Sequence, residues 1–175
     1  MLNPKIAVVG SGYWGKNLVR SFHKLGVLRI VCDLREEVLS DIAARYDVPI
    51  TTNVERLLND PEITAVVIST PAVQHFELAH RCIRADKDVF VEKPLALRAR
   101  EGAALVEVAN QRGRILMVGH ILQYHPAILE LKHRIRSGDL GNLQYLYSSR
   151  LNLGKLRNEE NILWSFAPHD ISAIL

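Results

Sequence analysis

The chain has 175 residues, a formal net charge of +3, and 48% hydrophobic and 23% charged residues. These values are ordinary for a globular protein, so they argue against disorder and allow a sizeable core. Lysines and arginines are spread along the chain, unlike the clustered charge of nucleic-acid-binding domains. No apolar run reaches the roughly 18 residues that cross a membrane, and no signal-peptide pattern opens the chain, so we expect a cytoplasmic protein. Cys32 and Cys82 show no metal-ligand spacing, so no metal site is expected.

Short apolar runs alternate with amphipathic segments over most of the chain. The pattern predicts strands at 5–9, 28–32, 50–51, 65–69, 88–92 and 115–119, and helices at 13–25, 38–46, 54–58, 73–85, 99–111 and 126–136. Strands that alternate with helices in this way imply right-handed crossovers between parallel strands. The sequence therefore predicts an α/β fold, a doubly wound parallel sheet of the Rossmann type over residues 1–120.

The pattern changes after Gly141. Residues 143–151 predict one long strand, a polar and basic stretch follows, and an apolar segment from 162 predicts the start of a helix. We interpret residues 121–175 as the beginning of a second, α+β domain for substrate binding or oligomerisation, which this chain leaves incomplete.

A glycine-rich turn follows the first predicted strand and opens the first helix. It consists of Gly10, Ser11, Gly12, Tyr13, Trp14 and Gly15. In this GxGxxG pattern the first glycine allows a tight turn, the second lets the backbone approach a pyrophosphate, and the third lets helix and strand pack closely. The helix N-terminus adds unpaired N–H groups for the phosphates. The turn therefore predicts a dinucleotide site, against the alternative of a glycine-rich turn without a ligand.

Asp33 ends the second strand and bears on the choice of dinucleotide. Its carboxylate can accept hydrogen bonds from the adenosine ribose hydroxyls and would repel a 2′-phosphate, so we expect NAD as the cofactor. Arg35, two residues later, could instead bind that phosphate and weakens the discrimination.

Further candidates stand where the later strands end. Rossmann sheets bind ligands beyond the carboxyl ends of their strands, and there the sequence places Thr70, Pro71, His75, Glu92, Lys93 and His120 as candidate cofactor contacts. For the two histidines, a satisfied residue at a helix end is an equal alternative.

These segments together resemble one known family. The stretches GSGYWGKN, STPAVQH, VEKPLAL, VGH and PHDI are similar to those of the Gfo/Idh/MocA oxidoreductases. With YHPAI, RLNLGKLRNEEN and LWSFAPHDIS, the chain most resembles the branch of UDP-N-acetylglucosaminuronate 3-dehydrogenases. The resemblance implies NAD-dependent oxidation at C3 of a UDP-linked N-acetylamino-sugar uronate, in nucleotide-sugar synthesis for surface polysaccharide.

The same resemblance implies two catalytic residues, Lys93 and His169. An imidazole can accept a proton near neutral pH, so we expect His169 to take the hydroxyl proton and Lys93 to orient or stabilise the oxygen, with exchanged roles as the alternative. Many relatives carry an aspartate where this chain has Ser165, so a carboxylate that could orient the histidine is absent. Tyr124, Asn152 and Arg157 are candidate substrate contacts.

Length is the larger departure from the family, whose members carry a further antiparallel sheet that shapes the sugar site. Two alternatives therefore remain open: a non-catalytic NAD(H)-binding fragment, and a polyol or inositol dehydrogenase. The expected partner is a small nucleotide-sugar substrate, with neither nucleic acid nor membrane, and a homo-oligomer is possible through the further sheet.

Overall fold

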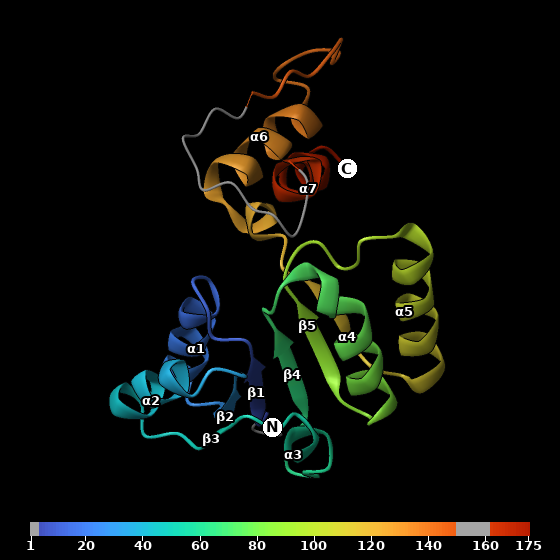
Figure 1. Ribbon diagram of the computed structural model, residues 1–175. Coiled ribbons are helices and arrows are strands. Elements are labelled where there is room, and N and C mark those ends of the chain that lie inside the picture. The colour runs from blue at the N-terminus through green and yellow to red at the C-terminus, as the bar shows by residue number, and fades with distance from the viewer. Residues whose placement is uncertain (1–3, 150–161) are drawn as a thin grey trace. The chain divides into compact units, whose positions relative to one another are not determined.

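The computed structural model describes residues 4–149 and 162–175 (Figure 1). The chain divides into two compact units, Met1–Gly119 and His120–Leu175. The strands of the first unit are β1 (Ile6–Val9), β2 (Leu28–Cys32), β3 (Ile50–Thr51), β4 (Ala65–Ile68), β5 (Asp88–Val91) and β6 (Leu116–Val118). Its helices are α1 (Gly15–Lys24), α2 (Glu36–Arg45), α3 (Glu55–Leu58), the 3₁₀ turn η1 (Ala72–Gln74), α4 (His75–Arg84) and α5 (Ala99–Arg112). The second unit contains η2 (Ile121–Tyr124), α6 (Pro126–Ser137) and α7 (Ile162–Ile174).

The six strands form one parallel sheet in the order β3-β2-β1-β4-β5-β6. The chain winds outward from β1 to β3, returns to the centre at β4 and winds outward again to β6. The predicted doubly wound Rossmann sheet is confirmed. The order reverses between β1 and β4, and in open α/β sheets this switch point is where ligands bind.

Both faces of the sheet are covered, because each strand sends alternate side chains to opposite sides. Ala7 and Val9 of β1 join a buried cluster that includes Cys82 of α4 and Leu105 of α5. Val8, between them, joins a second cluster with residues of α1 and α2. Figure 1 shows these helix pairs on either side of the strands. The near-continuous apolar runs of the sequence are therefore explained by strands that are buried on both faces.

Two helices begin two residues later than the sequence predicted. Helix α1 starts at Gly15 because Gly12, Tyr13 and Trp14 form the preceding turn. Pro71 is followed by the 3₁₀ turn η1, and the α-helix proper starts at His75. Both differences lie at element ends next to the predicted ligand-binding edge, where the chain is shaped by turns rather than by helical periodicity.

The prediction of a strand at 143–151 is wrong for residues 143–149, which form no strand. Their side chains are exposed, and no part of the chain that the structure describes offers them a neighbouring strand. A strand needs such a neighbour, since its N–H and C=O groups otherwise have no ladder to join. The remaining two positions lie outside the described residues. The apolar segment from 162 does form a helix, α7.

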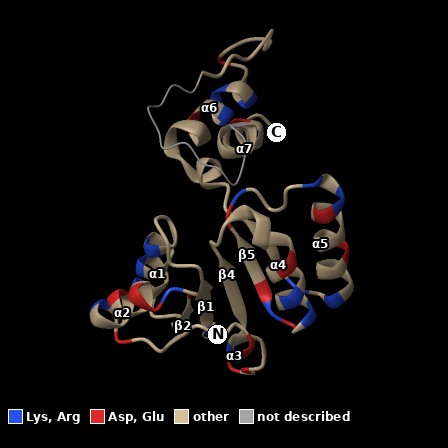
Figure 2. Ribbon diagram, viewed as in Figure 1, with Lys and Arg blue, Asp and Glu red and all other residues tan. Residues whose placement is uncertain are grey.

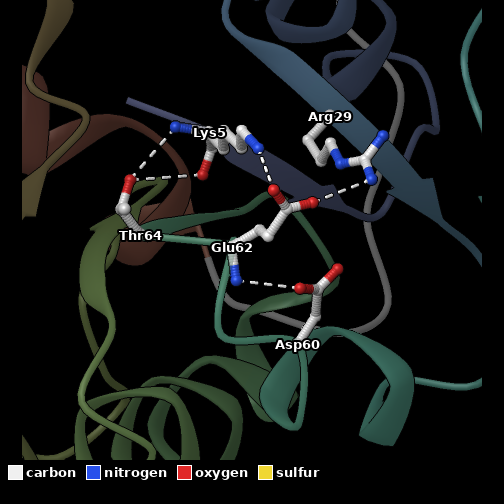
Figure 3. A network of polar contacts seen from close by, with 5 residues as sticks. All are labelled: Lys5, Arg29, Asp60, Glu62 and Thr64. Carbon is white, nitrogen blue, oxygen red and sulfur yellow. Dashed lines mark hydrogen bonds and ion pairs between the residues drawn. The ribbon is translucent and has the colours of Figure 1, made fainter. Parts of the chain in front are cut away.

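A polar network closes the amino-terminal edge of the sheet, away from the predicted site (Figure 3). Glu62 accepts hydrogen bonds from the ammonium group of Lys5 and from Arg29, the latter at 3.1 Å. The backbone N–H of Lys5 donates to the Thr64 hydroxyl at 3.1 Å. The Lys5 ammonium, and then Arg29, lower the pKa of Glu62. These exposed pairs tie the first strand to the loop before β4.

Charges elsewhere on the first unit are mixed. Figure 2 shows acidic and basic residues interspersed on α2, α4 and α5. No helix among the described residues is both long and apolar enough to span a bilayer.

The packing of α1 against the sheet predicts unequal effects of two glycine substitutions. A Cβ on Gly15 would lie 2.2 Å from the Gly10 carbonyl oxygen, whereas one on Gly102 of α5 would meet only Leu95 at 3.8 Å. Gly15→Ala should therefore lower the free energy of unfolding by about 1–3 kcal/mol through overpacking. Gly102→Ala should raise it by up to about 1 kcal/mol, because alanine favours a helix. Urea unfolding of both variants measures this, and equal effects would contradict the close packing.

Candidate cofactor and active site

Candidate residues follow four neighbouring strands, β2, β1, β4 and β5, at the carboxyl edge of the sheet. The backbone N–H of Gly10, Ser69 and Glu92 each donates to the last residue of the neighbouring strand, at 2.8, 2.9 and 2.9 Å. Asp33 follows β2 in the same way and donates to Thr51 at 3.3 Å. Neighbouring strands lie about 4.8 Å apart, so the row from Asp33 to Glu92 is roughly 14 Å long. This edge can hold an extended ligand with one end at β2 and the other at β5.

The glycine turn forms the middle of this row. Gly10 has a left-handed backbone (φ +84°), and a Cβ there would lie 2.8 Å from backbone atoms of Ser69 and Thr70. The Ser69 hydroxyl donates to the Gly10 carbonyl at 2.5 Å. The first and third glycines are thus required by the protein's own packing, because they let the β1–α1 turn lie directly against the end of β4.

Gly12 is different, since the protein itself does not fill its side-chain position. Among the described residues, a Cβ there would meet only the end of the flexible Arg35 side chain, at 3.5 Å. Tyr13, the next residue, is 89% exposed. The described residues therefore leave the outer side of the turn open, as a pyrophosphate that approaches the backbone would need. The turn fits the dinucleotide that the sequence predicted.

Asp33 is a buried carboxylate held by hydrogen bonds. It receives the Ser11 backbone N–H at 2.8 Å and the Ser11 hydroxyl at 3.1 Å, and Ser11 is fully buried. Arg35 donates to it from its backbone N–H and from two side-chain nitrogens at 3.0–3.1 Å. Burial raises the pKa of Asp33, but the hydrogen bonds from Arg35 and Ser11 outweigh burial and hold it at about 2. The negative charge at this end of the row is therefore fixed at neutral pH.

A hydrogen bond crosses the site from the glycine turn to β5. The Trp14 indole N–H donates to the Glu92 carboxylate at 2.7 Å. Burial raises the pKa of Glu92, and the hydrogen bonds from Trp14 and from the Lys93 backbone act against that rise. A Cβ on Gly119 would lie 3.0 Å from the same carboxylate, so the end of β6 also encloses it. Glu92 and the following half-buried Lys93 thus lie at the far end of the row from Asp33.

His75 is buried and engaged with backbone groups. Its ring nitrogens lie 2.7 Å from the Pro94 carbonyl oxygen and 2.8 Å from the Thr70 carbonyl oxygen, and the residue is 1% exposed. These contacts favour the satisfied helix-end histidine over a cofactor contact. Its role is to join the loops after β4 and β5, the two loops that carry Thr70 and Lys93.

Thr70 and Pro71 lie where the sequence placed them, directly after β4. Within the part of the chain that the structure describes, the Thr70 hydroxyl oxygen is buried and has no hydrogen-bond partner. A buried polar atom without a partner is uncommon and calls for an explanation such as a missing ligand or water. Pro71 precedes η1 with extended backbone and an exposed ring.

The remaining candidates belong to the second unit or lie outside the described residues. Burial lowers the pKa of His120, whose Nδ1 finds no partner among the described residues. Tyr124 is 66% exposed at the end of η2. His169 lies within α7, one residue after Pro168, and its carbonyl accepts a hydrogen bond from Ser172 at 3.0 Å. The predicted substrate contacts Asn152 and Arg157 lie outside the described residues.

Sequence reasoning missed two contacts of this site. Ser69 was assigned to a strand end, yet its hydroxyl fixes the Gly10 carbonyl, a role that a small polar residue at a switch-point strand end could have suggested. The Trp14–Glu92 bond joins residues 78 positions apart and has no local signal in the sequence.

Comparisons with known proteins agree with this geometry. A family model described as an oxidoreductase family with an NAD-binding Rossmann fold, Gfo/Idh/MocA, matches residues 4–120. The chain is 30% identical over its whole length to a UDP-N-acetylglucosamine 3-dehydrogenase of Acidithiobacillus ferrooxidans, of which it covers 54%. It is 31% identical, over 82% of its length, to a 2,7-anhydro-N-acetylneuraminate hydratase of Mediterraneibacter gnavus, of which it covers 38%. The chain thus spans about half or less of these relatives.

A solved structure gives the same fold with a dinucleotide. GenD2 from gentamicin A biosynthesis, crystallised in complex with NAD, superposes with a TM-score of 0.74 at 30% identity. The match covers 78% of this chain and 40% of that one.

The depressed pKa of Asp33 predicts a pH-dependent contribution to stability. An unfolded aspartate has a pKa of about 3.9, and the folded value is about 2. The contribution should therefore be complete above about pH 5 and disappear as the pH falls to about 2. Asp33→Asn should lower the free energy of unfolding by about 1 kcal/mol or more at neutral pH, because it loses charged hydrogen bonds. Urea titrations of both proteins between pH 7 and 2 measure this, and a difference that does not shrink toward pH 2 would contradict it.

Proposed function

Because the chain belongs to the Gfo/Idh/MocA oxidoreductase family and carries its NAD-binding Rossmann fold, we propose that it serves NAD-dependent oxidation of a sugar hydroxyl. The proposed substrate is a UDP-linked N-acetylamino sugar, in particular its uronate, oxidised at C3. A relative of similar sequence is named as a UDP-N-acetylglucosamine 3-dehydrogenase, which supports this substrate class.

One observation carries the proposal: the row of residues along the carboxyl edge, from Asp33 through the glycine turn to Glu92 and Lys93. Asp33 offers a fixed carboxylate for the ribose hydroxyls of the adenosine half. The turn and the N-terminus of α1 offer backbone N–H groups for the pyrophosphate. Glu92 and Lys93 then lie at the end where the nicotinamide half belongs, and where a substrate hydroxyl must come.

Oxidation of a hydroxyl group requires three contributions from the protein. NAD⁺, when bound, would supply the hydride acceptor, so the protein must orient the sugar, receive the hydroxyl proton and stabilise the oxygen as the proton leaves. In our proposal the Lys93 ammonium donates a hydrogen bond to that oxygen, and His169 receives the proton, with exchanged roles as the alternative. The loop that carries Lys93 is anchored through the Pro94 carbonyl to the buried His75. This anchor supports a fixed position of the lysine.

Two other functions make different predictions for a substrate panel. The panel contains UDP-N-acetylglucosaminuronate, UDP-N-acetylglucosamine and myo-inositol, each with NAD, and NADH absorbance is the signal. Our proposal predicts NADH formation with a UDP-sugar and none with inositol. Turnover of inositol alone would replace the proposed substrate with a polyol. Saturable NADH binding without any turnover would instead support the non-catalytic dinucleotide-binding fragment.

The role of Lys93 predicts a loss of turnover without a loss of cofactor. Lys93→Ala should lower kcat by about 10²-fold, within the usual range for general acid–base groups. Its NADH affinity should stay within about threefold of the wild type, since the adenosine and pyrophosphate contacts are untouched. Lys24→Ala, at the exposed end of α1, is the matched control and should leave both values unchanged. A Lys93→Ala protein that keeps more than a tenth of kcat would remove Lys93 from the mechanism.

A further inference from the structure

The Asp33 carboxylate has no acceptor position left for a ribose. A carboxylate offers about four lone-pair positions on its two oxygens. Oδ2 receives Ser11 N at 2.8 Å, Ser11 Oγ at 3.1 Å and Arg35 Nη2 at 3.1 Å. Oδ1 receives Arg35 N at 3.1 Å and Arg35 Nε at 3.0 Å. The hydroxyls of an adenosine ribose can therefore reach Asp33 only if some of these donors leave.

The donors differ in how easily they can leave. Ser11 is fully buried in the glycine turn, and its backbone N–H is fixed by the fold. The Arg35 side chain is 53% exposed and approaches the carboxylate from solvent. Asp33 itself is buried, so only the guanidinium end of this ion pair faces solvent, where water can replace the hydrogen bonds that Arg35 gives up. Ser11 should therefore keep the carboxylate in place while the Arg35 guanidinium moves away.

The guanidinium also stands beside the turn that must receive the cofactor. Arg35 Nη2 would lie 3.5 Å from a Cβ built on Gly12. Gly12 is the glycine whose open side-chain position admits the backbone-bound pyrophosphate. Arg35 thus occupies the space between Asp33 and Gly12, where the adenosine half of a dinucleotide must enter.

We propose that Arg35 is a specificity-determining residue that competes with the cofactor's ribose for Asp33. NAD must displace the guanidinium before its ribose hydroxyls can bind the carboxylate, so Arg35 weakens NAD binding. Once displaced, the same guanidinium lies next to the ribose, where it can form a bidentate pair with a 2′-phosphate. Arg35 therefore reduces the difference in affinity between NAD and NADP that Asp33 alone would give. This inference concerns the cofactor alone and stands whatever the substrate is.

Dissociation constants of NADH and NADPH test the competition in the 175-residue chain. Arg35→Gln should bind NADH about two- to fivefold more tightly, because NADH no longer has to break the ion pair between Arg35 and Asp33. The same variant should bind NADPH at least about threefold more weakly, because the partner of the 2′-phosphate is gone. Arg35→Lys keeps the charge without the planar fork, so both affinities should change in the same directions as in Arg35→Gln but by smaller factors.

Arg45→Gln is the matched control. Arg45 is an exposed arginine at the other end of α2, so its loss changes the net charge equally and should leave both constants unchanged. Thermal unfolding checks that each variant is folded, and Arg35→Lys carries the test alone if Arg35→Gln does not fold. An unchanged or weaker NADH affinity in the folded Arg35 variants would overturn the proposal, because it would make Arg35 neutral or a favourable cofactor contact.

Discussion

The contact between the glycine turn and the end of β4 is the constraint on which the rest of the site depends. Gly15 has no room for a side chain because the Gly10 carbonyl oxygen lies where its Cβ would be. The hydroxyl of Ser69, directly after β4, donates a hydrogen bond to the same oxygen. This contact places the N-terminus of α1 at the switch point of the sheet. Residues that follow four neighbouring strands thus border the proposed dinucleotide site. The position of the site is therefore set by backbone packing and does not depend on its charged side chains.

The pKa values of the two carboxylates at the ends of the row are shifted in opposite directions. Asp33 is buried, but hydrogen bonds from Arg35 and Ser11 keep its pKa at about 2. Burial dominates at Glu92, whose pKa is raised in spite of the hydrogen bond from Trp14. The proposed adenosine end thus carries a carboxylate that stays charged at neutral pH. Glu92, at the proposed nicotinamide end, has a raised pKa, and shifted pKa values are common among groups at reacting centres.

The sequence was sufficient for the sheet and for the order of the residues along its edge. Runs such as 65–69 are apolar on both faces and end in polar residues, which is a local signal that tertiary structure only reinforces. The contacts within the site were beyond its reach. Whether Trp14 meets Glu92 depends on how two loops far apart in sequence come together. Whether the Arg35 side chain folds back on Asp33, two residues away, depends on its rotamer. In the segment 143–149 the sequence instead predicted an element that does not form. A strand pattern forms a strand only where another strand can pair with it.

The central claim is that a dinucleotide binds along the carboxyl edge, with adenosine at Asp33 and nicotinamide at Glu92 and Lys93. Amide ¹H–¹⁵N spectra recorded during titration with NADH test this most directly, because every strand end contributes its own signals. We predict saturable shifts in the segment from Gly10 to Gly15 and at Asp33, Thr70 and Lys93. The amino-terminal network around Glu62 should stay unchanged. Shifts confined to the Glu62 edge, or none at saturating NADH, would contradict the account.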